Sequence, residues 1–360
     1  MAPTLQIAAF IKKAAVTAGF DVVGIAPVRD FGELAHFPEW ISKGYAGEMK
    51  YMEARDENGQ LKRASLKSTA PWARSVIVCA VNYNTDHPYS AQTHDPRRGW
   101  IARYAWGQSD YHDSLLAKLR RIEAQMKEFL FREFVPKEIT TRCYVDTGPL
   151  VERVYAKYAG VGWFGKNTCI INQQQGSWLF LGVVLTSLDL DAAADLPAPD
   201  RCGTCTRCIE ACPTDALLAP YQLDATKCIS YLTIEKRGEI PPDLRDRMGS
   251  QVFGCDICQD VCPWNRRAPA SSAPEFQPRD GLFNPALAWL TEMNEEDFRR
   301  TFRGSAIRRA KRAGLRRNAL IAIGNSGDTE FLPLLEKIAS TDDDPVVREH
   351  ADWAKAKLKV

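Results

Sequence analysis

The feature that most limits how this chain can fold is a compact run of four cysteines, RCGTCTRCIEACP. Cys202, Cys205, Cys208 and Cys212 follow one another in steps of three, three and four residues, and Pro213 comes directly after the last. A structural zinc site usually takes two cysteine pairs separated by a longer loop. The run is instead typical of a bacterial ferredoxin segment, in which three thiolates bind one [4Fe–4S] cluster and the fourth binds another.

A second, incomplete run supplies the remaining ligands for two clusters. The segment CDICQDVCP holds three cysteines before Pro263, and Cys228 lies upstream of it. The ferredoxin pattern assigns Cys202, Cys205, Cys208 and Cys262 to cluster one, and Cys212, Cys228, Cys255 and Cys258 to cluster two. A structural zinc domain is the alternative interpretation.

The chain as a whole is typical of a globular protein with more than one domain. It has 360 residues, of which 45% are hydrophobic and 26% charged, and this length is large for a single core. No apolar run approaches the roughly 18 residues of a membrane span. Lys12 and Lys13 interrupt what would be the apolar region of a signal peptide, so we expect a cytoplasmic protein without a membrane anchor. Eleven cysteines, an odd number, argue against a disulfide scaffold.

Hydrophobic patterning predicts an α+β fold. Helical periodicity alternates with strand-like segments through the first 190 residues, without regular βαβ repetition. Beyond the cysteines the sequence is helical, and LRRNALIAI is echoed by VREHADWAK at a period of 32 residues, which is typical of a HEAT-like helical repeat. We predict a mixed α/β domain at 1–190, a two-cluster ferredoxin-like module at 191–267, and an α-helical HEAT-like region at 268–360.

The glycine-rich stretch AGVGWFGKNT imitates two nucleotide-binding motifs. Both motifs require a helix after the glycines, whereas here we expect a helix before them and a strand after. The stretch is therefore either a loop that offers backbone N–H groups, Lys166 and Asn167 to a polar ligand, or an ordinary tight turn. Further along, NTCIIN and SWLFLGVVLTSL are expected to pair as a hairpin across QQQG.

Asp146 is the candidate acid. It ends the predicted strand TTRCYVD, and Pro149 is expected to start the next helix. From the local sequence, capping of that helix is the simpler role for the carboxylate. A catalytic role remains open, because strand ends that face a cleft often carry acids and bases.

Positive charge is concentrated in one segment, RRTFRGSAIRRAKRAGLRR. It holds nine basic residues and no acid, so that the rest of the chain has 38 basic against 45 acidic residues. This segment is either a solvated helical face or a phosphate-binding surface, and the acidic balance elsewhere favours RNA. The predicted RNA-binding residues are Arg299, Arg300, Arg303, Arg308, Arg309, Lys311, Arg312, Arg316 and Arg317.

The order of these motifs resembles the epoxyqueuosine reductases. The resemblance runs through YMEARDENGQLKR, ARYAWGQSDYH, VDTGPLVER, GWFGKNT, the two cysteine runs, CISYLTIE and the terminal repeat, and so covers nearly the whole chain. It implies reduction of epoxyqueuosine to queuosine at the wobble position of tRNA. The clusters would pass electrons from an unidentified low-potential donor to a cobalamin, and a monomer is expected.

The resemblance also implies roles for individual residues. Asp146 would be the proton donor, with a pKa raised by the desolvating cofactors around it, and Tyr231 would contact the RNA. The sequence begins but does not complete Asp-x-His-x-x-Gly at Asp110, because Leu115 replaces the glycine, so cobalt should have no histidine ligand from the protein. The predicted cofactor contacts are Arg63, Arg103, Tyr104, Lys166, Asn167, Thr168, Ser230 and Glu235.

Three other functions are compatible with parts of the pattern. A reductive dehalogenase-like enzyme for a small molecule would share the corrin and the clusters, but it would have no use for the repeat and the basic segment. An electron-transfer subunit would bind no cobalamin. An RNA-binding protein with a structural metal domain would contain zinc without sulfide.

Overall fold

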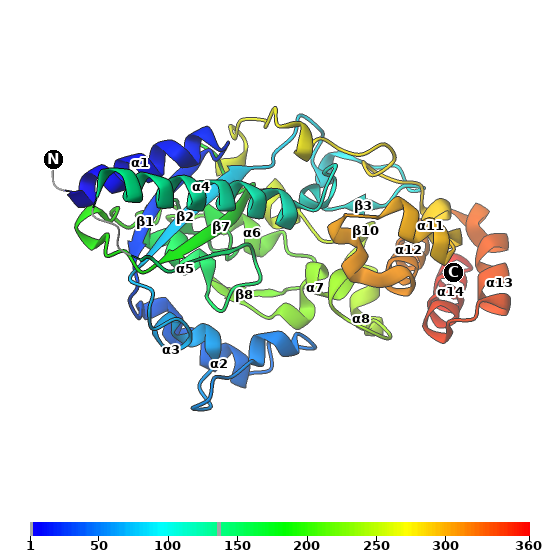
Figure 1. The fold of residues 1–360 in the computed structure, drawn as a ribbon. Helices are drawn as coiled ribbons and strands as arrows, with labels where there is room; N and C mark the ends of the chain where they lie inside the picture. The colour runs from blue at the N-terminus through cyan, green and yellow to red at the C-terminus, as the bar shows by residue number, and fades with distance from the viewer. Residues whose placement is uncertain (1–2, 135–137) are drawn as a thin grey trace. The chain divides into compact units, whose positions relative to one another are not determined.

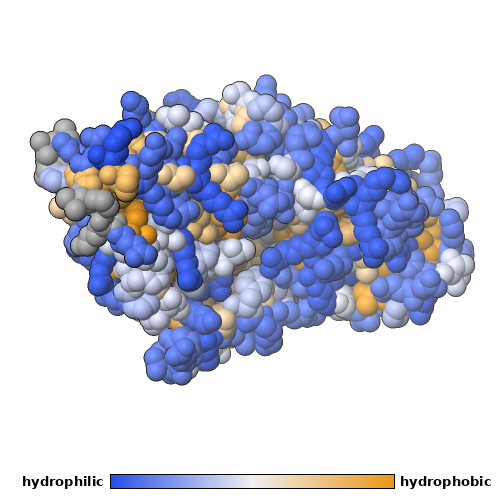
Figure 2. Space-filling view, in the orientation of Figure 1, coloured by the Kyte–Doolittle hydropathy of each residue, from blue (hydrophilic) through white to orange (hydrophobic). Residues whose placement is uncertain are grey.

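The computed structural model describes residues 3–134 and 138–360, and these group into two compact units. Unit 1 comprises Met1–Asn84, Tyr111–Cys205 and Pro263–Ser271, and unit 2 comprises Thr85–Asp110, Thr206–Cys262 and Ser272–Val360. Much of the face drawn in Figure 2 is hydrophilic. Among the described residues, no helix combines the length and apolar character needed to cross a bilayer.

Unit 1 is built on a four-stranded antiparallel sheet (Figure 1). In spatial order its strands are β1 (Val22–Pro27), β2 (Ser75–Asn82), β7 (Leu179–Thr186) and β4 (Thr141–Tyr144). All eight residues of β2 are buried, which requires that both faces of the sheet be covered.

Helices cover the two faces of this sheet. On one face, α4 (Tyr111–Glu133) lies so close that a side chain at Gly182 would meet Leu119 at 2.9 Å. The neighbouring residue Val183 points to the opposite face, where it shares a hydrophobic cluster with Tyr155 of α5 (Glu152–Tyr158). The first helix, α1 (Pro3–Thr17), packs beside α4 (Figure 1). Two shorter helices, α2 (His36–Ser42) and α3 (Leu66–Thr69), complete the unit.

The glycine-rich stretch follows a helix and leads into a strand, as predicted. After α5 comes β5 (Trp163–Phe164), which pairs with β6 (Ile170–Ile171). The predicted hairpin across QQQG is present only at its turn, where Asn172 and Gly176 form an antiparallel bridge. Strand β6 pairs with β5 rather than with β7, which joins the main sheet. Gly162 makes this close pairing possible, since a Cβ there would lie 2.4 Å from the Ile171 carbonyl oxygen.

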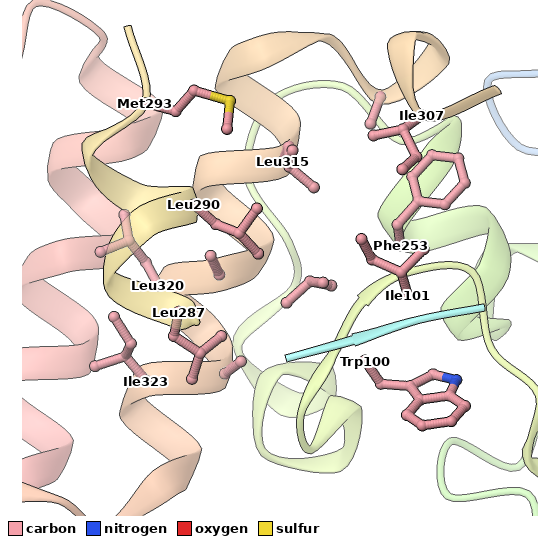
Figure 3. Close-up of a cluster of buried hydrophobic side chains, with 14 of the residues drawn as sticks. Trp100, Ile101, Phe253, Leu287, Leu290, Met293, Ile307, Leu315, Leu320 and Ile323 are labelled. Carbon is pink, nitrogen blue, oxygen red and sulfur yellow. The ribbon is translucent and has the colours of Figure 1, made fainter. Parts of the chain in front are cut away.

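Unit 2 combines short cysteine-bearing elements with a helical core. Its strands are β3 (Trp100–Ile101), parallel to β10 (Gln251–Phe253), and the hairpin β8 (Leu217–Ala219) and β9 (Gln222–Leu223). Its short helices are α6 (Arg207–Glu210), α7 (Ile229–Ile234), α8 (Pro242–Arg245), α9 (Ile257–Asp260), α10 (Leu287–Glu292) and α11 (Glu295–Thr301). Trp100, Ile101 and Phe253 from the two parallel strands share one apolar core with Leu290 of α10 (Figure 3).

Three longer helices end the chain: α12 (Lys311–Ser326), α13 (Leu332–Thr341) and α14 (Pro345–Leu358). Every residue of α12 from 315 to 324 is buried, so this helix is surrounded on all sides rather than amphipathic. It packs closely on α14, where a side chain at Gly324 would meet Trp353 at 2.6 Å. The two echoed sequence segments fall on α12 and α14. Their assignment to a HEAT-like repeat, and the three predicted domains, stay predictions.

Candidate functional site

The four predicted ligands of cluster two all lie in unit 2. Cys258 lies within α9, Cys255 lies two residues before that helix, and Cys228 directly precedes α7. Burial, followed by the charge of Cys228, raises the pKa of Cys255 well above its usual range, and Asp256 and Cys212 add smaller contributions. Bound together as thiolates, these side chains would need a compensating positive charge, which iron would supply. Their residue type and their order along the chain are those of a [4Fe–4S] ligand set.

The predicted ligands of cluster one are divided between the units. Cys202 and Cys205 occupy a tight loop of unit 1, in which the Cys205 amide donates to the Cys202 carbonyl at 3.2 Å. Lys166 binds the same loop, with its Nζ atom 2.6 Å from the carbonyl oxygen of Gly203. Cys208 and Cys262 belong to unit 2. The described residues contain no group of three or more Cys, His, Asp or Glu side chains arranged around one metal ion.

Asp146 lies in the turn that follows β4, and it does not cap a helix. The next helix, α5, begins only at Glu152, and the residue before it, Val151, makes no side-chain cap hydrogen bond. The capping role considered for Asp146 is therefore wrong. The Asp146 backbone is left-handed, with φ of 58°, a conformation that aspartate tolerates better than most residues. Its side chain is 60% exposed, so the carboxylate faces solvent.

Two side chains at the start of α4 hold the Asp146 carboxylate. The Tyr111 hydroxyl donates a hydrogen bond to Oδ2 of Asp146, and Nε2 of His112 lies 3.8 Å from the same oxygen. The Tyr111 ring stacks on Phe180 of β7, with ring centroids 4.1 Å apart. Packing against the sheet thus fixes the hydroxyl that orients the acid.

Glu152 is a second carboxyl at this site, and the sequence reading missed it. Its Oε1 atom is fully enclosed and has no hydrogen-bond partner. Burial, followed by the negative charge of Asp146, raises the pKa of Glu152 to about 7, and Arg63 and Arg153 oppose the rise. The only sequence signal was its place in VDTGPLVER, six residues after Asp146.

Three predicted cofactor contacts form the turn between β5 and β6. Asn167 is buried, and its Oδ1 atom accepts from the Cys169 amide at 3.3 Å. Thr168 has a left-handed backbone, with φ of 66°, and its carbonyl oxygen accepts from Arg153 at 3.0 Å. In β5, before this turn, the indole nitrogen of Trp163 is buried without a hydrogen-bond partner. Lys166, Asn167 and Thr168 are thus held in one turn by hydrogen bonds to its backbone and side chains.

Two other predicted cofactor contacts bind the protein itself. Arg63 donates to the carbonyl of Tyr51 at 2.9 Å. Arg103 in unit 2 is only 1% exposed, and its two terminal nitrogens donate to the Thr85 side chain and to the carbonyls of Thr85, His87 and Pro88. Burial therefore gives the Arg103 guanidinium a structural role, which corrects its prediction as a corrin contact. Tyr104, also in unit 2, is partly buried beside Phe253.

The CISYLTIE segment of unit 2 forms α7 and the residue after it. Ser230 is partly buried, whereas Tyr231 is only 6% exposed. Glu235 ends the helix and forms an ion pair with Arg309. One predicted cofactor contact and one predicted RNA contact are thus neighbours in the structure.

Two members of the predicted RNA-binding set are buried, which is a correction. Arg316 donates to the Thr291 carbonyl at 2.6 Å and forms an ion pair with Asp342. Arg317 is 1% exposed and donates to backbone carbonyls, including that of Leu232 at 2.8 Å. Neither guanidinium is available to a phosphate.

The other seven basic side chains of the segment are at least partly exposed. Arg299 pairs with Glu295, and Arg300 pairs with Asp297. Arg312 also approaches Glu295, at 3.3 Å. These ion pairs neutralise part of the charge that the sequence count suggested.

Two family models match segments of the chain. Residues 201–265 match the family described as a 4Fe-4S double cluster binding domain. Residues 63–147, which include Asp146, match the family described as Epoxyqueuosine reductase QueG, DUF1730.

Curated relatives and a solved structure are similar over nearly the whole chain. The epoxyqueuosine reductase of Xanthomonas campestris pv. campestris is 39% identical over 357 residues, covering 97% of this chain and 96% of that protein. The epoxyqueuosine reductase of Synechocystis sp. is 44% identical over 302 residues, covering 82% and 98%. A crystal structure of epoxyqueuosine reductase with an epoxyqueuosine-modified tRNA-Tyr stem loop is similar with a TM-score of 0.86 and 31% identity, covering 99% of this chain and 91% of that one.

Proposed function

This chain belongs to the epoxyqueuosine reductase family, and we propose that it reduces epoxyqueuosine to queuosine at the wobble position of tRNA. The observation that carries the proposal is the extent of the likeness, which covers 97% of this chain in the relative from Xanthomonas campestris. The solved structure that contains a modified tRNA stem loop supports tRNA as the substrate.

Two [4Fe–4S] clusters would carry electrons through the protein. The match to a double-cluster domain supports their number. The ferredoxin pattern supports the ligand sets Cys202, Cys205, Cys208 and Cys262 for cluster one, and Cys212, Cys228, Cys255 and Cys258 for cluster two. All four members of the second set lie in unit 2, which supports it.

Cobalamin is the proposed cofactor at which substrate is reduced, and it supplies the low-potential chemistry when bound. In unit 1 the turn formed by Lys166, Asn167 and Thr168 would hold its polar groups, together with Arg63. Tyr104, Ser230 and Glu235 are the proposed contacts from unit 2.

Asp146 would deliver a proton to the oxygen released from the epoxide. Its carboxylate faces solvent and is held by Tyr111, as a group that must reach a bound substrate requires. The residue therefore combines an oriented side chain with access to substrate.

The helical C-terminal region would bind the RNA backbone. We propose that α12 to α14 are a HEAT-like repeat and that Arg299, Arg300, Arg303, Arg308, Arg309, Lys311 and Arg312 contact phosphates. Tyr231, although buried here, is the proposed RNA contact outside this segment. The three functional regions would be 1–190, 191–267 and 268–360.

The proposal also covers the oligomeric state, the cellular location and the electron donor. The protein would work as a monomer in the cytoplasm, where tRNA is available. An unidentified donor of low potential would reduce its clusters one electron at a time.

Anaerobic turnover tests the proposed function. Reconstituted protein would receive an epoxyqueuosine-containing anticodon stem-loop and a strong reductant, with or without cobalamin, and mass spectrometry would identify the nucleosides. Queuosine should form only with cobalamin. Bound cobalamin without any queuosine would contradict the proposed substrate, and a failure to bind cobalamin would contradict the proposed cofactor.

A further inference from the structure

Arg309 differs from the paired arginines at the start of the basic segment in where its acidic partner comes from. Arg299 and Arg300 pair with exposed acids of their own helix, four and three positions earlier. Arg309 instead pairs with Glu235 at the end of α7, and its Nε atom lies 2.5 Å from Oε1 of that carboxylate. The Glu235 side chain is only 16% exposed. Exposed pairs on one helix constrain their side chains weakly, whereas a mostly buried carboxylate fixes the direction of the guanidinium that it binds.

The backbone of Arg309 is held by the same part of unit 2. Ile307 and Ala310, on either side of it, are buried in the apolar core, where Figure 3 shows Ile307 near Phe253. Arg237 donates from one terminal nitrogen to the Arg309 carbonyl at 2.9 Å and from the other to the Ile234 carbonyl at 3.0 Å. Arg309 is therefore fixed at its backbone and at its side chain by the end of α7 and the residues that follow.

Although it is fixed in this way, Arg309 still faces solvent. Its side chain is 49% exposed. A guanidinium carries five N–H donors, and the contact with Glu235 uses the Nε–H, whereas arginine binds phosphate through two donors of its planar fork. A flexible side chain that is ordered before binding also loses less conformational entropy when its ligand arrives. Arg309 thus has the properties of a pre-organised phosphate contact.

We propose that Glu235 is a positioning residue that orients Arg309 toward one phosphate of the tRNA backbone. This inference rests on the proposed function and deepens its RNA-binding part. Glu235 acts through Arg309 and does not contact the phosphate, and this role is additional to its proposed contact with the cofactor. The phosphate bound by Arg309 would lie beside α7, the helix that carries the proposed RNA contact Tyr231. Among the exposed cations of the basic segment, Arg309 should contribute most to RNA affinity.

Pre-organisation and net charge predict opposite effects of removing Glu235. Loss of an acid next to a phosphate-binding surface lowers the repulsion of RNA, so charge alone predicts tighter binding. Loss of the group that orients Arg309 makes the guanidinium mobile, so pre-organisation predicts weaker binding. The direction of the change therefore tests the proposal.

The decisive experiment measures the affinity of the reconstituted protein for an epoxyqueuosine-containing anticodon stem-loop by fluorescence anisotropy across a salt series. Glu235→Gln should weaken binding by about three- to tenfold, the cost of ordering one long side chain. Glu239→Gln is the matched control, because it removes an exposed acid four residues further along that belongs to no ion pair among the described residues. This control should bind as well as the wild type or slightly more tightly.

A double-mutant cycle separates positioning from a general effect on the fold. In an Arg309→Ala background, Glu235→Gln should cause no further weakening, because no guanidinium remains to be oriented. Arg309→Lys tests the proposal even if Glu235→Gln folds poorly. It keeps the charge but loses the planar fork, so the slope of log K against log salt should be unchanged while affinity falls by about as much as in Glu235→Gln.

Three results would overturn the positioning role. Tighter binding by Glu235→Gln would show that Glu235 competes with phosphate for Arg309. Equal weakening with and without Arg309 would show that Glu235 acts by another route, and wild-type affinity in Arg309→Lys would show that the oriented fork is not needed. If the wild type bound no stem-loop at any salt concentration, the proposed tRNA substrate would be wrong as well. If it bound the stem-loop and formed queuosine while the cycle was additive, only the positioning role would be wrong.

Discussion

The acids near Asp146 and the arginines of the basic segment differ in how the protein satisfies their charges. In unit 1, Asp146 is exposed, and the enclosed oxygen of Glu152 has no hydrogen-bond partner. In unit 2, Arg316 and Arg317 are buried and bound to carbonyl and carboxylate oxygens. The two acids can therefore take part in a reaction, whereas these two arginines stabilise the fold.

This difference shows that a count of charges in a sequence does not reveal their function. Nine basic residues suggested one continuous RNA-binding surface, yet Arg317 stabilises the core. A single acid, Asp146, suggested a helix cap, yet it lies free of the helix beside a second carboxyl. The role of a charged side chain depends on whether its hydrogen-bond and ion-pair partners lie within the protein.

The largest effect is expected from removing the proposed proton donor. Asp146→Asn keeps the shape of the side chain but cannot donate the same proton, so single-turnover formation of queuosine should fall by about 10²- to 10⁴-fold. RNA affinity should not change. Asp191→Asn, an exposed acid of unit 1 that pairs with Arg29, is the control. A rate within about threefold of wild type for Asp146→Asn would remove this residue from the chemistry.

A large loss of stability should distinguish a buried arginine from an exposed one. Arg317→Met leaves the carbonyls of Leu232, Lys236 and Gly238 without their donor, and each unsatisfied buried group costs roughly 1–3 kcal/mol. We expect a loss of about 3 kcal/mol or more in thermal or urea unfolding. Arg308→Met, on the exposed part of the same segment, should change stability by no more than about 0.5 kcal/mol. Equal losses of stability in the two variants would contradict the distinction between buried and exposed arginines.

Local sequence predicted those features that depend on spacing. The double-cluster segment was read from the cysteine intervals, and the family model that matches residues 201–265 confirms a double-cluster domain. The α+β character followed from helical and strand periodicities, and the structure has mixed helices and an antiparallel sheet.

Features that depend on distant partners were not predictable from local sequence. Arg317 is buried because it binds Leu232, which is 85 residues away along the chain. The segment NTCIIN pairs with β5, where Gly162 permits close contact at Ile171, and it meets its downstream neighbour only at the bridge between Asn172 and Gly176. Glu152 looked like an ordinary acid at a helix start, since enclosure of its Oε1 atom depends on tertiary packing.

Glu152 in unit 1 and His350 in unit 2 should change the stability of the protein with pH in opposite directions. The pKa of Glu152 is raised from 4.5 to about 7, so the folded state is penalised as the pH rises through this window and carries the full penalty above it. Glu152→Gln should therefore stabilise the protein at pH 8 by up to about 3 kcal/mol, and hardly at all at pH 4.5. Thermal melting of wild type and variant at the same pH measures the difference. Equal stabilisation at both pH values would contradict it.

His350 of unit 2 should show the reverse dependence. Its Nδ1 donates to the Val346 carbonyl at 2.8 Å and its Nε2 accepts from the Ile240 amide at 3.2 Å, so the ring is neutral. Burial lowers the pKa of His350 from 6.5 to about 3. Below pH 6.5 this histidine is protonated in the unfolded chain but neutral in the folded state, so the free energy of unfolding falls by about 1.4 kcal/mol per pH unit. His350→Gln should reduce this acid sensitivity in thermal melting, and an unchanged slope would contradict it.

The smallest effects are expected from single exposed cations of the basic segment. Arg303, Arg308 and Lys311 are exposed, and no ion pair in the described part of the chain neutralises them. Each change to Ala should weaken stem-loop binding less than tenfold and lower the slope of log K against log salt by about 0.7–0.9, the value for one phosphate contact. Arg299→Ala should have less effect, because Glu295 already pairs with that arginine. Lys13→Ala, an exposed cation of α1, is the control. If Lys13→Ala changed the slope as much as Arg308→Ala, RNA binding would depend on the net charge of the protein rather than on this segment. The difference between buried and exposed arginines would then be irrelevant to RNA binding.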